Sequence, residues 1–293
     1  MTETSLAGMV EAVDDGATIA LGGKTLHRAP MAFVRELVRA GVDDLTLVGL
    51  ANSMDVDLPC GSEQVAGVHY GYVGFEWLGL APNFRAAAEA GTIDPHEGTC
   101  YSVATMLRAA KQGVPFLPLA GLDGSDLLET NPVFETIEDP FSGEKVTAVR
   151  RVRPEIAVVH ASEADAVGNA RFDGADLSER LLARSAETVF VTAERLVDTA
   201  TFETAPDRTA IPGFLVDGVA EVPYGAHPLS MPGRYGYDTA HLQSYLDRSP
   251  AAIDDYIEET VGSTEAAYRE QVVDDRIEAL DWGHPTPDPV IGR

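Results

Sequence analysis

Three glycine-bearing segments follow apolar runs of this sequence, and each places polar groups where a strand is expected to end. Glycine lets a backbone N–H come close to a phosphate or carbonyl oxygen, and Asn and Ser side chains hydrogen-bond carboxylates. We therefore predict that these segments bind substrate, the alternative for each being a simple turn or a helix cap. The predicted substrate-binding residues are Gly22, Gly23, Asn52, Ser53, Gly124 and Ser125.

Two charged residues are further candidates. Arg28 carries a planar guanidinium that can hold a carboxylate or phosphate through two hydrogen bonds. In so acidic a chain a structural ion pair is at least an equal interpretation. Glu97 lies just before Thr99, where a helix is expected to begin. It is either a catalytic or substrate-orienting carboxylate, or an acidic residue that complements the positive end of that helix.

Common catalytic and metal-binding signatures are missing from the sequence. It contains no GxGxxG, GxxxxGK[ST] or GxSxG segment, which disfavours a dinucleotide site, a P-loop and a hydrolase nucleophile elbow. Cys60 and Cys100 have no zinc-ligand spacing, so we expect neither a metal nor a disulfide framework. His160 and His227 are interpreted as hydrogen-bonded structural groups.

The elements that would position these residues alternate between strands and helices. Ala17–Leu21, Leu45–Gly49 and Ile156–His160 are short apolar runs of the kind buried in parallel sheets. Helical spacing follows Pro30 as far as Gly41, and again covers Thr99–Gln112. This alternation predicts an α/β fold, a mostly parallel sheet covered by helices on both faces.

We expect one domain over residues 1–282, followed by a proline-rich tail over residues 283–293. The polar, turn-rich stretch from Glu129 to Lys145 is too short to be a linker between domains. Ligands of parallel α/β sheets bind beyond the carboxyl ends of the strands, which is where the glycine-bearing segments fall.

Composition narrows the class of partner. The 293 residues include 47 acidic and 21 basic side chains, for a net charge of −26, which disfavours nucleic acids and anionic membranes. With only three lysines the composition is typical of a salt-adapted protein, the alternative being a mildly acidic protein of a mesophile. The first residues lack the features of a secretory signal, and no apolar stretch approaches the roughly 20 residues of a membrane span. We expect a cytoplasmic protein.

Six ordered segments together resemble the α subunits of family I coenzyme A transferases, in particular those of the glutaconate CoA-transferase type. They extend over about residues 5–230 and are individually weak. The segments are Asp15–Gly23 with Arg28 and Pro30, Asp44–Val48, Pro115–Pro118, Gly124–Ser125, Ile156–Ala161 with Gly168, and Pro223–Pro228.

The resemblance implies a CoA-transferase-like α/β fold that pairs with a β subunit of the same fold, with the active site between them. In that family a glutamate attacks an acyl-CoA and becomes a glutamyl-CoA thioester, which a second carboxylate accepts. The glutamate belongs to a Ser-Glu-Asn-Gly-type motif of the β subunit, and this chain has no such motif. The chain is therefore expected to be half of an enzyme that uses acyl-CoA and a carboxylic acid as substrates and holds no other cofactor.

A second interpretation is the α subunit of a ring-opening acyl-CoA hydrolase, which breaks a carbon–carbon bond. Pro30–Arg35 and Gly262–Ala266 are similar to the steroid ring-opening members of the family. Those enzymes use an α-subunit glutamate near the start of the helix that precedes the Pro-Phe-Leu-Pro segment. Glu97 falls a few residues early, and Cys100 takes the matching position. A third interpretation is an acyl-CoA-binding regulator without catalysis.

Overall fold

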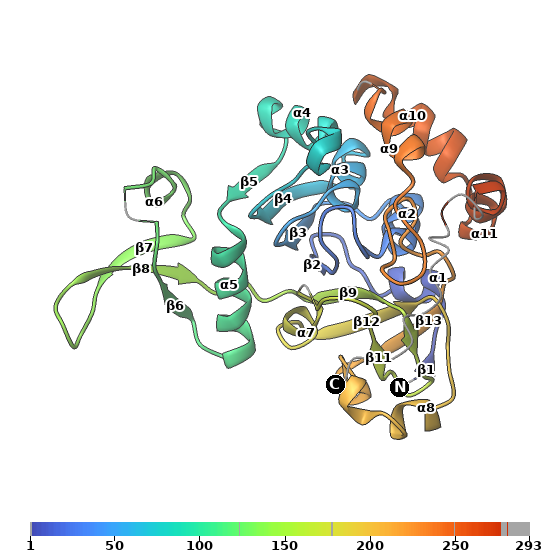
Figure 1. Ribbon diagram of the computed structural model, residues 1–293. Helices are drawn as coiled ribbons and strands as arrows, with labels where there is room; N and C mark the ends of the chain where they lie inside the picture. Colours follow the sequence, from blue (N-terminus) through green and yellow to red (C-terminus); the bar gives the residue numbers. More distant parts are fainter. Residues whose placement is uncertain (1, 123, 177, 249, 277–279, 281–293) are drawn as a thin grey trace.

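A computed structural model describes residues 2–122, 124–176, 178–248, 250–276 and 280, and Figure 1 shows its arrangement. The tail predicted over residues 283–293 lies outside the described residues. Among the residues that are described, no helix has the length and apolar character needed to cross a bilayer.

An eight-stranded sheet forms the centre of the molecule, and all of its strand pairings are parallel, as predicted. From β2 the chain proceeds outward through β3, β4 and β5, and it later returns to build the other half beside β2. Across the sheet the strands are β1 (Thr2–Glu3), β13 (Gly218–Glu221), β12 (Thr188–Ala193), β9 (Ile156–Ala161), β2 (Thr18–Leu21), β3 (Leu45–Gly49), β4 (Val65–Tyr70) and β5 (Asp94–Glu97).

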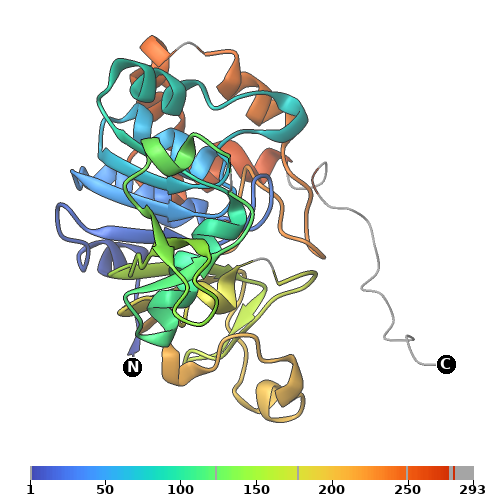
Figure 2. The ribbon, with the colours of Figure 1, turned by 90° about the vertical axis from the view of Figure 1, so that its left-hand side faces the viewer.

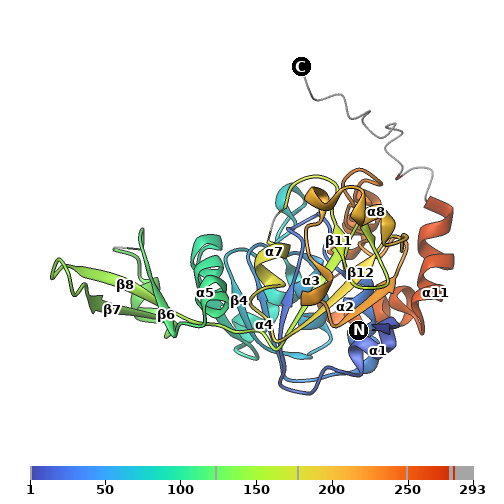
Figure 3. The same cartoon turned by 90° about the horizontal axis from the view of Figure 1, so that it is seen from below.

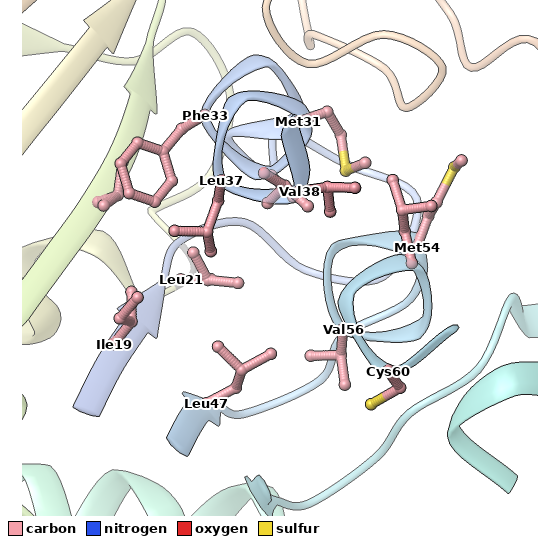
Figure 4. Packing of buried hydrophobic residues seen from close by; sticks show 14 of the residues in the cluster. Ile19, Leu21, Met31, Phe33, Leu37, Val38, Leu47, Met54, Val56 and Cys60 are labelled. Atoms are coloured by element: carbon pink, nitrogen blue, oxygen red, sulfur yellow. The ribbon is translucent and has the colours of Figure 1, made fainter. Parts of the chain in front are cut away.

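Helices cover both faces, because successive strand residues point to opposite sides. Ile19 and Leu21 of β2 pack in the large core, which also takes in Phe33 and Leu37 of α2 (Figure 4). Ala20, between them, packs on the other face against α5 and α7. The first face carries α1 (Leu6–Val10), α2 (Met31–Ala40), α3 (Met54–Gly61) and α4 (Pro82–Ala90); the second carries α5 (Cys100–Gln112) and α7 (Glu179–Leu182).

A small antiparallel sheet projects from the side of the molecule as an arm (Figures 1 and 3). Its strands β6 (Phe116–Leu119), β8 (Lys145–Arg150) and β7 (Phe134–Glu138) lie in that order, with α6 (Leu127–Thr130) beside them. The stretch predicted as turn-rich therefore contains β7 and the turn that leads into β8. Seen end-on in Figure 2, the arm lies in front of the main sheet. At its base it packs on Met106 of α5.

The chain beyond β13 packs back onto the first face. Here lie α9 (Thr239–Leu246), α10 (Ile253–Tyr256) and α11 (Glu265–Tyr268), and each helix of the last pair continues into a π-helical turn. Arg35 of α2, whose side chain is buried, pairs with Glu265 and lies over the ring of Tyr268. Shorter elements are β10 (Glu163–Ala164), β11 (Ala170–Arg171) and α8 (Ala200–Glu203).

Candidate active site

The carboxyl edge of the sheet brings together the loops that follow β2, β3, β4 and β5. In the sheet, β3, β4 and β5 lie in that order on one side of β2, and β9, β12 and β13 lie in that order on the other side. The boundary between β2 and β9 is a topological switch point, the place where open parallel sheets bind their ligands. Gly22 lies at this boundary, because its N–H donates to the carbonyl of Val158 at 2.9 Å.

The two glycines after β2 differ in what their amides do. The Gly22 amide belongs to the sheet ladder, which corrects its predicted role as a donor to substrate. Gly23 has φ of +89°, and a Cβ there would lie 2.5 Å from the Ala29 nitrogen, so only glycine fits. Its N–H donates to no backbone acceptor among the described residues. Gly23 is thus the member of the pair whose N–H has no backbone partner among the described residues.

Hydrogen bonds join the first three loops into one continuous edge. The Ser53 hydroxyl donates to the carbonyl of Thr25 at 2.6 Å, which connects the loop after β3 to the loop after β2. The Asn52 N–H donates to the carbonyl of Tyr72 at 2.9 Å, which connects it to the loop after β4. Further along, the Gly98 N–H donates to the carbonyl of Tyr70, so the end of β5 belongs to the same edge.

We call Asn52, Ser53 and Asp55 the β3 cluster. Asp55 is buried, and it accepts hydrogen bonds from the Asn52 side-chain amide at 2.5 Å and from the Ser53 N–H at 2.7 Å. Burial raises the pKa of Asp55 to about 6, and the hydrogen bonds only partly oppose this. Asn52 is 2% exposed, yet its Oδ1 has no hydrogen-bond partner in the described part of the chain. The cluster thus contains an unpaired buried acceptor beside a weak acid.

Arg28 lies in the loop after β2, but its guanidinium is bound to other groups of the same chain. Its guanidinium is buried, pairs with Glu179 of α7 at 2.7 Å and donates to the carbonyls of Asp173 and Ala175. It also lies over the ring of Phe172, 4.8 Å from the ring centre. Arg28 therefore forms the structural ion pair, which was the second of its two interpretations. The prediction that it clamps a carboxylate or phosphate of the substrate is corrected, because its guanidinium is already paired within the chain.

Glu97 ends β5, and its side chain is exposed at the carboxyl edge. The hydrogen bonds that cap α5 come from Thr99 and Ser102, which form a reciprocal capping box. Cys100 is the first residue of α5, exposed, with its thiol donating to the carbonyl of Leu50 at 3.2 Å. The strand that carries Glu97 has no apolar pattern, so its pairing with β4 gave no signal in the sequence.

Gly124 and Ser125 belong to the arm. Ser125 accepts a hydrogen bond from the Leu127 N–H at 3.3 Å, which fits the turn-or-cap alternative. In the described residues no hydrogen bond or ion pair joins either residue to Gly23, Asn52 or Glu97. The link between arm and edge is Asn131, whose amide donates to the Glu97 carbonyl at 2.6 Å.

A second buried cluster lies at the carboxyl ends of β9 and β12, and sequence reasoning missed its acidic member. We call His160, Thr192, Glu194 and Tyr235 the β9–β12 cluster. Glu194 accepts from His160 Nε2 at 2.8 Å, from the Tyr235 hydroxyl at 2.6 Å and from the Tyr224 N–H at 2.8 Å. Although burial alone would raise the pKa of Glu194, these donors together hold it below the ordinary value.

The two histidines singled out in the sequence are hydrogen-bonded within the fold, as predicted. His160 Nδ1 contacts the Thr192 hydroxyl at 2.9 Å, and His227 lies between the Tyr268 hydroxyl and Asp238. In the described part of the chain, no three His, Cys, Asp or Glu side chains are placed to share a metal ion.

Three exposed apolar side chains lie in the segments that follow β4 and β5 at this edge. Trp77 and Leu80, in the loop after β4, are 69% and 59% exposed, and Tyr101 of α5 is 56% exposed. Trp77 is held in place by a hydrogen bond of 3.3 Å between its indole nitrogen and the Tyr237 hydroxyl. Large exposed apolar residues around a polar site are typical of a surface that another protein covers.

Comparisons with known proteins agree with this geometry. The chain is 33% identical to a glutaconate CoA-transferase polypeptide of Acidaminococcus fermentans over 250 residues, which cover 80% of this chain and 78% of that one. The crystal structure of that glutaconate CoA-transferase superposes with a TM-score of 0.91, 30% identity and 96% coverage of both chains. The IpdA subunit of the cholesterol ring-cleaving hydrolase of Rhodococcus jostii is 32% identical over 280 residues, covering 92% of this chain and 94% of that one.

A longer relative is also similar. An uncharacterized protein of Archaeoglobus fulgidus is 35% identical over 253 residues, 85% of this chain, but the match spans only 56% of the archaeal protein's length. The family profile described as Coenzyme A transferase matches residues 3–222. The fold, the switch-point edge and these similarities lead to one conclusion: the chain belongs to the coenzyme A transferase family.

Proposed function

We propose that this chain is the α subunit of a two-subunit CoA transferase that moves CoA between an acyl-CoA and a carboxylic acid. Its similarity to glutaconate CoA-transferase, over 96% of both chains, supports this activity. The nucleophilic glutamate belongs to a β subunit of the same fold, in keeping with the absence of a Ser-Glu-Asn-Gly-type motif here.

The observation that carries the proposal is the composition of the carboxyl edge. Its loops carry Gly23 and the buried Asn52. The segments after β4 and β5 add three exposed apolar side chains, Trp77, Leu80 and Tyr101. Asp55, the carboxylate bonded to the Asn52 amide, is buried and hydrogen-bonded within the chain. Half of a shared active site needs groups that bind the acyl oxygen and an apolar surface that the partner subunit buries. This edge offers both.

Each edge residue has a role in this proposal. The Gly23 amide donates to an oxygen of the thioester or the acyl group. The Asn52 side-chain amide donates one N–H to Asp55, and its second N–H donates to the acyl carboxylate. Ser53 holds the two loops together through Thr25 and so positions Asn52. Donors fixed in advance stabilise the charge that develops on the acyl oxygen in the transition state. Apart from the CoA thioester substrate, the proposal needs no cofactor or metal.

The test begins with the chain isolated from its own cells under native conditions. We expect a complex with a second chain of similar size that contains a Ser-Glu-Asn-Gly-like segment. The complex should exchange CoA between an acyl-CoA and at least one member of a carboxylic acid panel, followed by mass spectrometry of the thioesters. A homo-oligomer that binds acyl-CoA but turns nothing over would contradict the proposal and favour the regulator.

The ring-opening hydrolase is the second candidate, because similarity to the cholesterol ring-cleaving enzyme extends over 92% of this chain. In that case Glu97, exposed at the edge, acts as the catalytic carboxylate. The discriminating variant is Glu97→Gln, with Glu135→Gln on the exposed side of β7 as its control. Hydrolysis centred on Glu97 would be lost in the first variant only, whereas CoA transfer would survive in both.

We further propose a single domain, a cytoplasmic location and adaptation to high salt, the last from the charge of −26 and the scarcity of lysine. Unfolding in urea at increasing KCl tests the adaptation. A salt-adapted chain gains stability up to multimolar salt, because repulsion among its carboxylates is screened within about 3 Å at 1 M. Stability that falls steadily with added KCl would contradict it.

A further inference from the structure

A hollow of about 460 Å³ lies between α3, α4 and α10, on the first face of the sheet (Figure 1). Glu63 and Thr92 line it, and each lies two residues before a strand, β4 and β5 respectively. The hollow is therefore beside the amino ends of these strands. Because the candidate active site lies at their carboxyl ends, the hollow is a separate place in the molecule.

Asn83, the second residue of α4, lines the hollow and has an amide oxygen without a partner. Its side chain is buried, and its Nδ2 donates to Asp57 Oδ2 and to the Tyr245 hydroxyl, both at 2.9 Å. Only the nitrogen of an amide can donate to a carboxylate, so this pair of bonds fixes which way the amide is turned. In the described part of the chain, Asn83 Oδ1 accepts no hydrogen bond. A buried oxygen of this kind needs a donor from outside the chain.

The space in front of this oxygen exists because residue 61 is glycine. A Cβ at Gly61 would lie 3.2 Å from Asn83 Oδ1 and 2.7 Å from Ile253 Cγ1. All three residues line the hollow. The unpaired oxygen therefore faces the hollow at a point that any side chain at position 61 would fill.

The charge around the hollow is negative. Glu63 and Asp254 line it, both are exposed, and neither forms an ion pair within the described residues. No basic side chain occurs among the described residues of the lining. The helices α3 and α4 also end here, at Gly61 and Ala90, and the carboxyl end of a helix carries partial negative charge. Side chains and helix ends together favour a cation.

The remaining wall is apolar, with Ala86 and Ala87 from α4 and Ile253 from α10. We propose that the hollow binds a small primary alkylammonium compound. Its ammonium group donates to Asn83 Oδ1 and lies near the two exposed carboxylates, and its carbon chain packs on the apolar wall. That wall distinguishes the ligand from a bare metal ion, which would be held by oxygens alone. The inference goes beyond the proposed transfer of CoA and does not depend on it.

The experiment uses the protein as isolated, with its copurifying partner, and n-butylammonium as the probe. Asn83 stays in place, because its amide also holds Asp57 and Tyr245. The charge-removal variant is Glu63→Gln with Asp254→Asn. Titration calorimetry at constant ionic strength measures the Kd of n-butylammonium, of n-butanol, which lacks the charge, and of tetramethylammonium, which lacks the N–H donors.

Two controls and a second variant complete the set. Glu135→Gln with Asp126→Asn removes two exposed carboxylates of the arm and is the control for charge. Gly61→Ala fills the space before Asn83 Oδ1. Its control is Gly67→Ala, where an added Cβ would meet no atom closer than 3.5 Å.

We expect the charge-removal variant to bind n-butylammonium about tenfold more weakly, roughly threefold for each exposed carboxylate. Gly61→Ala should lose more than about tenfold, because its methyl group covers the oxygen that accepts the ammonium hydrogen bond. Both controls should keep the natural Kd. n-Butanol and tetramethylammonium should each bind at least about tenfold more weakly than n-butylammonium.

Equal affinity for n-butylammonium in the charge-removal variant and its control would overturn the inference, and so would the absence of any binding. Tetramethylammonium that binds as tightly as n-butylammonium would also overturn it, because no N–H would then be needed. KCl that displaces the probe at equal concentration would make the hollow a site for alkali ions. A charge-removal variant that loses its partner but keeps its affinity for the probe would make it a protein contact. If Gly61→Ala does not fold, the charge-removal variant and the two comparison compounds decide the outcome.

Discussion

The two buried polar clusters at the carboxyl edge of the sheet differ in how their side chains are paired. In the β9–β12 cluster, Glu194 accepts three hydrogen bonds, one of them from His160, and its pKa is lowered. In the β3 cluster, Asp55 has amide donors but forms no ion pair with any described residue, and its pKa is raised to about 6. Asn52 there keeps an unpaired oxygen.

This difference in pairing suggests that one cluster stabilises the fold and the other takes part in function. A buried polar network with every member satisfied stabilises one arrangement of the chain, whereas an unpaired buried group lowers stability and is retained where a ligand or partner uses it. We infer that the β9–β12 cluster holds the strand ends in place and that the β3 cluster meets the substrate. Because Asp55 and Glu194 have pKa values shifted in opposite directions, the two clusters should also respond oppositely to pH.

The largest expected effect is the loss of stability on removing Glu194. In Glu194→Ala, the His160 Nε2 and the Tyr235 hydroxyl are left buried without their partner, so we expect about 3–5 kcal/mol of destabilisation at pH 7 in urea unfolding. Glu187→Ala, which breaks an exposed pair with Arg153, is the control and should lose under about 1 kcal/mol. If Glu194→Ala and Glu187→Ala lost similar amounts of stability, the β9–β12 cluster would not support the fold.

The next effect is the pH dependence of Asp55→Asn. A carboxyl group whose pKa is higher in the folded than in the unfolded state binds its proton more tightly when folded, so its contribution is favourable in acid and is lost as pH rises through about 6. The unfolded value is about 3.9. Relative to the natural protein, Asp55→Asn should therefore gain about 2 kcal/mol of stability between pH 4 and pH 7, measured by urea unfolding across that range.

The opposite sign is expected for Glu194→Gln. A carboxyl with a lowered pKa contributes stability above its unfolded pKa, about 4.3, and loses it as pH falls through the folded value. The free energy of unfolding of the natural protein should exceed that of Glu194→Gln by more at pH 7 than in acid. If both variants changed with pH in the same direction, the contrast between the clusters would fail.

The third effect is on activity. Asn52→Ala should lower the rate of CoA transfer about 100-fold, because a donor fixed against the acyl group is removed. Its stability should fall by only about 1 kcal/mol, because the lost hydrogen bond to Asp55 is partly offset by the loss of a buried unpaired oxygen. The measurements are steady-state transfer rates and urea unfolding.

Asn169→Ala is the matched control for Asn52→Ala. Asn169 also donates to a buried aspartate, Asp165, at 2.8 Å, but its own oxygen is paired with the Gly213 N–H at 2.9 Å. This variant should lose stability and keep its transfer rate. Equal loss of activity in the two variants would show that the unpaired oxygen does not mark the site.

The sequence predicts the frame of the site because that frame depends on local patterns. Gly23 and Asn52 follow apolar runs, and the parallel sheet predicted from those runs places their loops at one edge. Asp55 gave no such signal, because it lies in α3, a helix with Pro59 inside it, and its raised pKa follows from burial in the folded chain. The partners of Glu194 are 30 to 41 residues away in sequence, a distance at which single-sequence patterns carry no information.

The arm and Glu97 show the same limit. The segment from Phe134 to Glu138 is mostly polar, because one side of the arm faces solvent, and its sequence therefore resembles a turn-rich stretch. Glu97 lies in the strand Asp94–Glu97, which is a strand only through its pairing with β4. Arg28 had the correct chemistry for a clamp, but the carboxylate that it meets is Glu179, 151 residues later in the chain.

The smallest effect tests the supporting cluster within a single strand. Thr192→Val removes the hydroxyl that contacts His160 Nδ1 and keeps the shape of the side chain, so we expect a loss of about 1 kcal/mol in urea unfolding. Thr188→Val, at the first position of the same strand, should change stability by less than that. Transfer rates should stay unchanged in both, because the β9–β12 cluster acts on the fold. A Thr192→Val protein of natural stability with a transfer rate as low as that of Asn52→Ala would move His160 from support to catalysis.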